Sequence, residues 1–124
     1  MSNNGGAGMS NEYTPDKWEL IEIVSEEGET LYKILSSWYG GYGGSDSWRF
    51  SSGITKVVEH NKHYEVHNDS GSVYICHKGS KGMSAYTGIV FTNLKKQLKA
   101  KKLGTLKIVN RIKLNQFKQG EVNE

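Results

Sequence analysis

Apolar and polar residues alternate over short stretches along most of this chain, which is the pattern of β-strands with one buried face. The pattern predicts a first strand over residues 18–24 and a second over residues 31–37, joined by a turn at residues 26–29. Residues 48–58 predict a third strand, in which Gly53 indicates a bulge or a close approach of the backbone. We therefore expect the first half of the folded region to consist of strands.

The clearest hairpin spans residues 63–77, where two alternating stretches flank the turn residues Asn-Asp-Ser-Gly at 68–71. A loop over these four positions pairs Val66 with Val73 across the ladder. The predicted buried face carries Tyr64, Val66, Val73 and Ile75, and the opposite face carries His63, Glu65, His67, Tyr74 and Cys76.

The C-terminal part changes to helical spacing. Ser84 is expected to cap a helix over residues 85–102, and Gly104 is expected to end it. Residues 105–114 then alternate again and predict a last strand with one apolar and one basic face. In this strand Leu106, Ile108, Ile112 and Leu114 share one face, and Lys107, Arg111 and Lys113 share the other.

This order of elements predicts an α+β domain. It combines a mostly antiparallel sheet of about five or six strands with one helix, from the C-terminal half of the chain, packed on the sheet. Residues 1–14 hold almost nothing to bury and predict a disordered tail. Residues 15–117 are expected to form a single domain, and residues 118–124 a frayed tail.

The composition indicates the cellular compartment of the protein. Cys76 is the only cysteine among the 124 residues, so an internal disulfide is excluded and a reducing compartment is expected. No apolar run is long enough to span a bilayer, and the N-terminus has neither the basic start nor the apolar centre of a secretory signal. We therefore expect a cytoplasmic protein without a membrane partner; the sequence leaves its oligomeric state open.

Charge is distributed unevenly along the chain. Residues 1–94 carry seven Lys or Arg against eleven Asp or Glu, a net charge of −4, whereas residues 95–124 carry nine against two, a net charge of +7. This asymmetry predicts that the C-terminal part meets an anionic partner. The alternative is a solvated lysine-rich face that keeps the protein soluble. The expected anion-binding residues of this part are Lys95, Lys99, Lys102, Lys107, Arg111 and Lys113.

Residues 38–49 read Trp-Tyr-Gly-Gly-Tyr-Gly-Gly-Ser-Asp-Ser-Trp-Arg. Glycine lets the backbone approach a partner, and aromatic rings supply flat contact area at low entropy cost. We interpret the segment as a recognition loop whose rings stack on bases or nucleotides, with Asp46 as a hydrogen-bond acceptor and Arg49 as an anion clamp. The alternatives are rings in the core, and a turn-forming Asp46 in a structural ion pair. The expected contact residues are Trp38, Tyr39, Tyr42, Asp46, Trp48 and Arg49.

Lys78 and Lys81 lie in a glycine-spaced turn before the predicted helix, where free backbone N–H groups and the helix N-terminus attract anions. The residues Gly79-Ser80-Lys81-Gly82 resemble the Gly-x-x-Gly loop of KH domains, although here a strand precedes them instead of a helix. We add both lysines to the expected anion-binding residues. The alternative is an ordinary connection between a strand and a helix.

His60, His63, His67 and His77 gather around the predicted hairpin, together with Cys76. In the predicted register His63 faces Cys76, and His67 lies on the same face, a composition that Zn²⁺ accepts. The metal set His63, His67 and Cys76 would serve a small metal-dependent hydrolase. The alternative is an exposed polar hairpin face with a partly buried thiol.

Four phrases, Trp-Tyr-Gly-Gly-Tyr at 38–42, Asp-Ser-Trp-Arg at 46–49, Ser-Gly-Ile at 52–54 and Ser-Gly-Ser-Val-Tyr at 70–74, together resemble short uncharacterised proteins of tailed phages and prophages. The resemblance covers about residues 30–80. It implies an accessory protein of infection, such as a host-takeover or anti-defence factor acting in the host cytoplasm. It brings with it no fold, activity or functional residue.

These observations predict a non-enzymatic binding protein without a cofactor. It would grip nucleic acid or a nucleotide with the aromatic loop and the basic C-terminal face. One alternative is an inhibitor of a host enzyme, in which the same Trp, Tyr and Arg residues anchor a protein interface. The other is the metal-dependent hydrolase.

Overall fold

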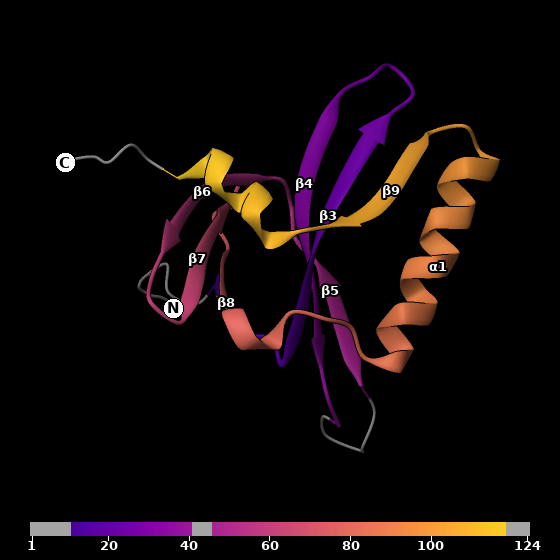
Figure 1. Ribbon diagram of the computed structural model, residues 1–124. Helices are drawn as coiled ribbons and strands as arrows, with labels where there is room; N and C mark the ends of the chain where they lie inside the picture. The colour runs from indigo at the N-terminus through magenta and orange to yellow at the C-terminus, as the bar shows by residue number, and fades with distance from the viewer. Residues whose placement is uncertain (1–10, 41–45, 119–124) are drawn as a thin grey trace.

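The computed structural model describes residues 11–40 and 46–118, and in them eight strands form two four-stranded sheets (Figure 1). The first sheet has the order β2 (Glu12–Tyr13), β8 (Val73–His77), β7 (His63–Asn68) and β6 (Ile54–Glu59). The second sheet has the order β5 (Ser47–Phe50), β4 (Thr30–Trp38), β3 (Lys17–Ser25) and β9 (Gly104–Val109). The helices are α1 (Ala85–Ala100) and the 3₁₀ segments η3 (Lys78–Ser80) and η4 (Arg111–Phe117).

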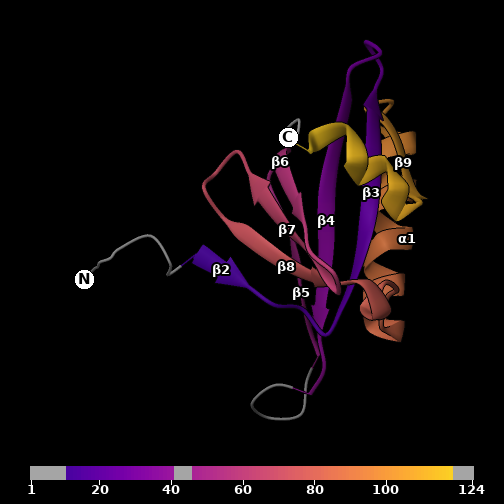
Figure 2. The ribbon, with the colours of Figure 1, turned by 60° about the vertical axis from the view of Figure 1, so that its left-hand side comes forward.

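The second sheet is the middle layer of the molecule. The first sheet and η4 cover one of its faces, and α1 covers the other (Figure 2). Neighbouring residues of β3 therefore enter two different cores: Leu20 packs between the sheets, and Ile21 packs beneath α1. Both side chains are fully buried, because a strand covered on both faces must be apolar on both.

The predicted α+β class is confirmed, with its one main helix in the C-terminal half. The first two predicted strands correspond to β3 and β4, which pair antiparallel. The predicted cap of α1 is also confirmed, since the Ser84 hydroxyl accepts a hydrogen bond from the Thr87 backbone N–H at 3.1 Å. None of the described helices is long and apolar enough to cross a lipid bilayer.

The predicted third strand, residues 48–58, is wrong as a single element. It is two strands, β5 in the second sheet and β6 in the first, and the chain crosses between the sheets in the segment that links them. The crossing is held by Ser51, whose hydroxyl accepts a hydrogen bond from the Ile34 N–H at 2.9 Å. Alternation alone cannot distinguish a bulged strand from one that changes sheets, because both keep the same period.

The predicted hairpin exists, but its register is shifted by one residue. Val66 lies opposite Tyr74 instead of Val73. In this register Asn68 is buried, and its amide donates to the carbonyls of Val66 at 3.2 Å and Ser72 at 3.1 Å. A shift of one residue exchanges the faces of a strand, so Tyr74 and Cys76 enter the core, and Val73 and Ile75 face outward.

The last predicted strand, residues 105–114, ends early at Val109. Asn110 then caps η4 by accepting a hydrogen bond from the Ile112 N–H at 2.9 Å. The 3₁₀ turn places Leu114 in the core between the sheets and leaves Ile112 exposed, so these two residues do not share a strand face.

The predicted end of the helix is also shifted. The helix ends at Ala100 instead of just before Gly104, and Lys102, with φ of +56°, takes the left-handed conformation common after a helix end. Gly104 begins β9 instead, with φ of +150°, where an added Cβ would lie 2.3 Å from the Val24 carbonyl oxygen.

Part of the predicted N-terminal tail is ordered. Glu12 and Tyr13 form β2 parallel to β8, and the Tyr13 ring stacks on Tyr74 with 5.0 Å between centroids. At the other end Lys118 forms a bridge with Val57. The rest of the two predicted tails lies outside the described residues.

Candidate functional site

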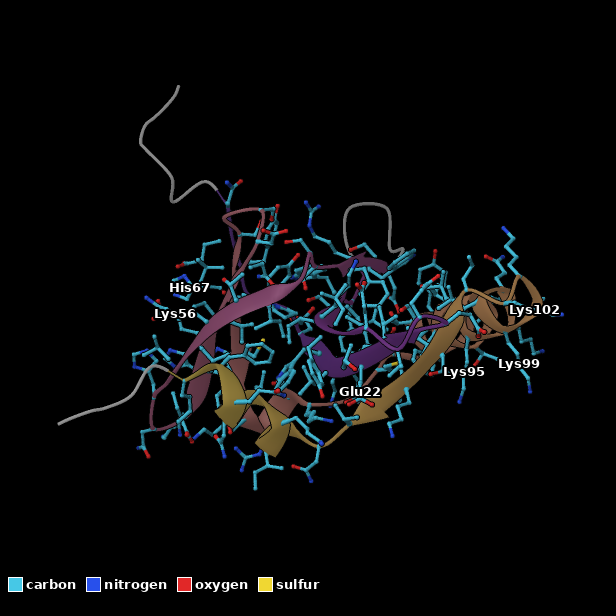
Figure 3. All side chains as sticks on the ribbon, turned by 90° about the horizontal axis from the view of Figure 1, so that it is seen from above. Glu22, Lys56, His67, Lys95, Lys99 and Lys102 are labelled. Atoms are coloured by element: carbon cyan, nitrogen blue, oxygen red, sulfur yellow. The ribbon has the colours of Figure 1, made fainter. Side chains whose placement is uncertain are left out.

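Lys95, Lys99 and Lys102 lie together along the flank of α1 that borders β9 (Figure 3). Lys95 and Lys99, at i and i+4, share one stripe of the helix, and Lys102 follows in the turn just after the helix ends. With Glu26 and the β9 residues Gly104, Thr105 and Leu106 they line a groove of about 390 Å³. We call this cavity the basic groove.

The packing of α1 determines which of its residues reach the basic groove. Phe91, Leu94 and Leu98 pack against the second sheet and fix the rotation of the helix. The groove lysines lie beside that apolar stripe, toward β9, where their stems cover apolar surface while their ammonium groups stay in water. Leu106, which is buried, supplies the apolar floor.

The groove lysines have no carboxylate within ion-pair distance in the described part of the chain. Even Glu26, which lines the same groove, forms no ion pair with them. The ammonium of Lys95 lies 5.9 Å from the centroid of the Phe91 ring. The groove therefore concentrates positive charge over an apolar floor.

The other cations of the predicted basic face lie elsewhere. The Lys107 ammonium lies 3.6 Å from a carboxylate oxygen of Glu22, and that carboxylate also accepts a hydrogen bond of 2.6 Å from the Tyr32 hydroxyl. The hydrogen bond lowers the pKa of Glu22 and raises the pKa of Tyr32; Lys107 and Lys113 lower the pKa of Glu22 further. Arg111 donates to the Tyr64 hydroxyl at 2.7 Å. The structure thus gathers only three of the six predicted cations in the groove.

The predicted anion loop at residues 79–82 is neutralised by acids. Lys81 pairs with Glu19, and Lys78 contacts Glu59 at 2.6 Å. Lys118 contacts the same Glu59 carboxylate at 2.8 Å, and the two lysines lower its pKa to about 2. These lysines hold the chain onto the sheets, which favours the structural alternative for this loop.

The rings of the predicted recognition loop point to opposite faces of the second sheet. Ser37 lies opposite Trp48, and Trp38 lies opposite Ser47, so the two indoles occupy successive positions of the ladder. Trp38 is half-buried and its indole N–H donates to the Thr14 carbonyl at 3.0 Å. Trp48 is 37% exposed, and Tyr39 is 51% exposed. Tyr42 lies outside the described residues.

Asp46 and Arg49 make separate contacts within the protein. The Asp46 carboxylate accepts a hydrogen bond from the Gly40 N–H at 2.9 Å, which is a turn-forming contact. The Arg49 guanidinium lies 4.5 Å from the centroid of the Tyr13 ring. Tyr13 was missed in the sequence because it stands alone among polar residues, and only its pairing with β8 brings it here.

The rings and the basic groove do not form one surface. The joined ends of β4 and β5 lie at the bottom of Figure 1, whereas the last turn of α1 lies at the top. The helix between them has 16 residues and is about 24 Å long. A ligand seated in the groove would therefore not reach the exposed rings unless it were extended.

The predicted metal set is wrong for Cys76. The register shift puts Cys76 in the core, where burial raises the pKa of its thiol, while His63 and His67 lie on the outer face of the first sheet. The Glu65 carboxylate lies 3.1 Å from the His60 ring nitrogen and 2.8 Å from that of His67, and both contacts lower its pKa. Across residues 11–40 and 46–118, no three His, Cys, Asp or Glu side chains are arranged to hold a metal ion.

Comparison of the chain with protein-family models, with curated proteins and with solved structures gives no match. The resemblance to phage proteins, the cytoplasmic location and the binding role therefore stay predictions.

Proposed function

We propose that the protein is a non-enzymatic binding protein whose basic groove takes an anionic partner. The observation that supports this role most directly is the row of Lys95, Lys99 and Lys102 over an apolar floor without a carboxylate partner. Lys78, Lys81 and Lys107 elsewhere on the described surface are paired with acids, whereas the groove brings three unpaired lysines together over an apolar floor.

The arrangement has a cost in stability that a solubility role does not require. Like charges at i and i+4 destabilise a helix by about 0.2–0.5 kcal/mol per pair, as for Lys95 and Lys99. The negative end of the helix dipole offsets part of this cost. Solubility is served equally well by lysines spread over the surface, whereas an anion site needs them adjacent.

Phosphate-bearing partners, either nucleic acid or a nucleotide, suit the charge of the groove. Lysines that neutralise phosphates release counterions, so the affinity falls with salt. The exposed rings lie at the other end of α1, so they add no stacking to a ligand held in the groove. We therefore expect affinity that depends mainly on charge.

The test is fluorescence anisotropy with a labelled single-stranded oligonucleotide. Three lysine–phosphate contacts give a slope of roughly −2 in log affinity against log salt, or roughly 20-fold weaker binding over a fourfold rise in salt. The triple variant Lys95→Gln/Lys99→Gln/Lys102→Gln should lose this binding and its salt dependence. The control Lys62→Gln/Lys96→Gln/Lys101→Gln removes the same charge from exposed positions outside the groove. Equal losses in both variants, or salt-independent binding, would contradict the proposal.

A second candidate function is inhibition of a host protein through the exposed aromatic residues Tyr39 and Trp48. Exposed Trp and Tyr residues anchor many protein interfaces. The variant Trp48→Ala should then abolish a stoichiometric complex from lysate without affecting oligonucleotide binding. Trp38→Phe is the matched control, since Trp38 is half-buried on the other face. A complex that survives Trp48→Ala rules out this function.

A further inference from the structure

The basic groove runs beside an open sheet edge. β9 is the last strand of the second sheet, and along residues 104–109 the described part of the chain places β3 on one side of it and no strand on the other. In an edge strand, every second residue directs its backbone N–H and C=O groups away from the sheet, where they lack a ladder partner. Figure 1 shows β9 at this edge, with α1 alongside.

Cationic side chains flank this edge on both faces of the sheet. Lys95, Lys99 and Lys102 lie on the α1 side, and Lys107, with a 65% exposed side chain, lies on the other. Ile108 is 41% exposed on the α1 side and extends the apolar floor that Leu106 begins. The edge thus combines three features: free backbone groups, an apolar strip and unpaired positive charge on the α1 side.

We propose that the partner of the basic groove is an acidic polypeptide segment that adds to β9 as an extra strand. This inference rests on the proposed function, because it names the class of anion that the groove takes. An extended peptide can pair with an exposed sheet edge through its backbone, while its alternate side chains select the partner. Asp or Glu side chains on the α1 side of the added strand would reach the groove lysines.

Other occupants use fewer of these features. A nucleic acid would meet the lysines but gain no base stacking, since Phe91, the ring nearest to Lys95, is only 8% exposed. It would also leave the β9 backbone groups unpaired. A second copy of the chain could pair with the edge, but its own lysines would face these lysines, and like charges across strands are unfavourable.

The direct test uses a labelled peptide of alternating glutamate and valine, long enough to span β9, and measures its anisotropy with the full chain. Two further peptides carry N-methyl groups on either one or the other set of alternate backbone nitrogens. In an added strand only one of these sets faces β9. One methylated peptide should therefore bind like the parent, and the other should bind about tenfold more weakly or worse, since it loses ladder hydrogen bonds. Equal binding of all three peptides would overturn the inference.

Hydrogen exchange gives a second readout of the same contact. The parent peptide should slow exchange at alternate backbone amides of residues 104–109 and leave the amides between them unchanged. Uniform protection, or protection confined to residues of α1, would overturn strand addition. The variant Lys95→Glu/Lys99→Glu/Lys102→Glu should reverse the preference toward a lysine–valine peptide, and an unchanged preference for the acidic peptide would also count against the inference.

An oligonucleotide of equal charge distinguishes a failure of strand addition from a failure of the proposed function. If the oligonucleotide binds and the acidic peptide does not, strand addition fails while the proposed function stands. If neither probe binds, both fail. If the acidic peptide binds with the two-residue pattern of methylation and exchange, strand addition and an anionic partner are both supported, and an oligonucleotide that fails to bind then excludes nucleic acid as that partner.

Discussion

Lys102 occupies a backbone position that favours glycine. It has φ of +56°, and the chain around it closes α1 with two hydrogen bonds, from the Leu103 N–H to the Leu98 carbonyl at 2.9 Å and from the Lys102 N–H to the Lys99 carbonyl at 3.1 Å. This is the Schellman motif, whose left-handed residue is usually glycine because glycine has no Cβ to clash there. The substitution Lys102→Gly should therefore stabilise the protein.

The expected gain follows from two opposing terms. The left-handed conformation costs an L-residue about 1–2 kcal/mol, which glycine does not incur. Glycine also makes the unfolded chain more flexible, which destabilises the folded state by about 0.4–1 kcal/mol. The net stabilisation by Lys102→Gly is about 0.5–1 kcal/mol, or a rise of roughly 2–4 °C in Tm for a chain of this size.

The assay is urea and thermal unfolding followed by far-UV circular dichroism. Lys102→Ala is the control, because alanine removes the same charge but keeps the Cβ in the strained conformation. Lys102→Gly should be more stable than both the original chain and Lys102→Ala, while both variants bind an anionic probe more weakly. A glycine variant that is no more stable than the alanine variant would refute the strain assigned to Lys102.

Three further predictions concern the rest of the structure. The two lysines beside Glu59 hold its pKa near 2 against an ordinary 4.5. The stabilisation that these contacts give the folded state is therefore complete above pH 4.5 and is lost as the pH falls toward 2. Because solvent reaches these groups, we expect the original chain to lose about 1 kcal/mol more than Glu59→Gln over that range in acid unfolding, and parallel curves would contradict this. The Cys76 thiol, buried and with a raised pKa, should react with a thiol reagent only at the rate of unfolding; rapid labelling of the folded protein would refute its placement. Ser36 buries a hydroxyl without a partner among the described residues, so Ser36→Ala should leave the free energy of unfolding unchanged or raise it. Ser51→Ala should instead lower the free energy of unfolding by about 1–2 kcal/mol in urea, because the Ser51 hydroxyl is hydrogen-bonded. Equal effects of the two variants would contradict these different hydrogen-bonding states.

Local patterns in the sequence predict the helices and strands of this fold better than they predict strand register and sheet membership. The Ser84 cap, the first two strands and the hairpin each depend on residues close together in the chain, and each is present. The errors lie where contacts between residues far apart in the sequence determine how strands pair. The observed hairpin register buries Tyr74 and Cys76 in the core that includes Trp18 from β3, and the crossing at Ser51 depends on the backbone of Ile34.

The candidate site is likewise predicted in part by local sequence patterns and in part determined by distant contacts. The i, i+4, i+7 spacing of the groove lysines is visible in the sequence, and so is their position at the end of a helix. Which lysines pair with acids is not visible, because the partner acids are remote in the sequence: Glu59 is 59 residues from Lys118, and Glu19 is 62 residues from Lys81. The rings of residues 38–49 are close together in the sequence. The pleat of the paired strands directs Trp38 and Trp48 to opposite faces, and this pairing is not visible in the sequence.

The groove lysines beside the β9 edge can serve two roles, recognition of a partner and protection of the edge. Charges beside an open edge repel an identical edge, since the lysines of a second copy would approach the same lysines. The same charges attract a strand that carries carboxylates, so an edge protected against self-association is also selective for an acidic partner. Protection alone would be satisfied by lysines paired loosely with acids, as Lys107 is with Glu22. Lys95, Lys99 and Lys102 line one groove over an apolar floor and form no ion pair in the described chain, and this grouping favours recognition over protection.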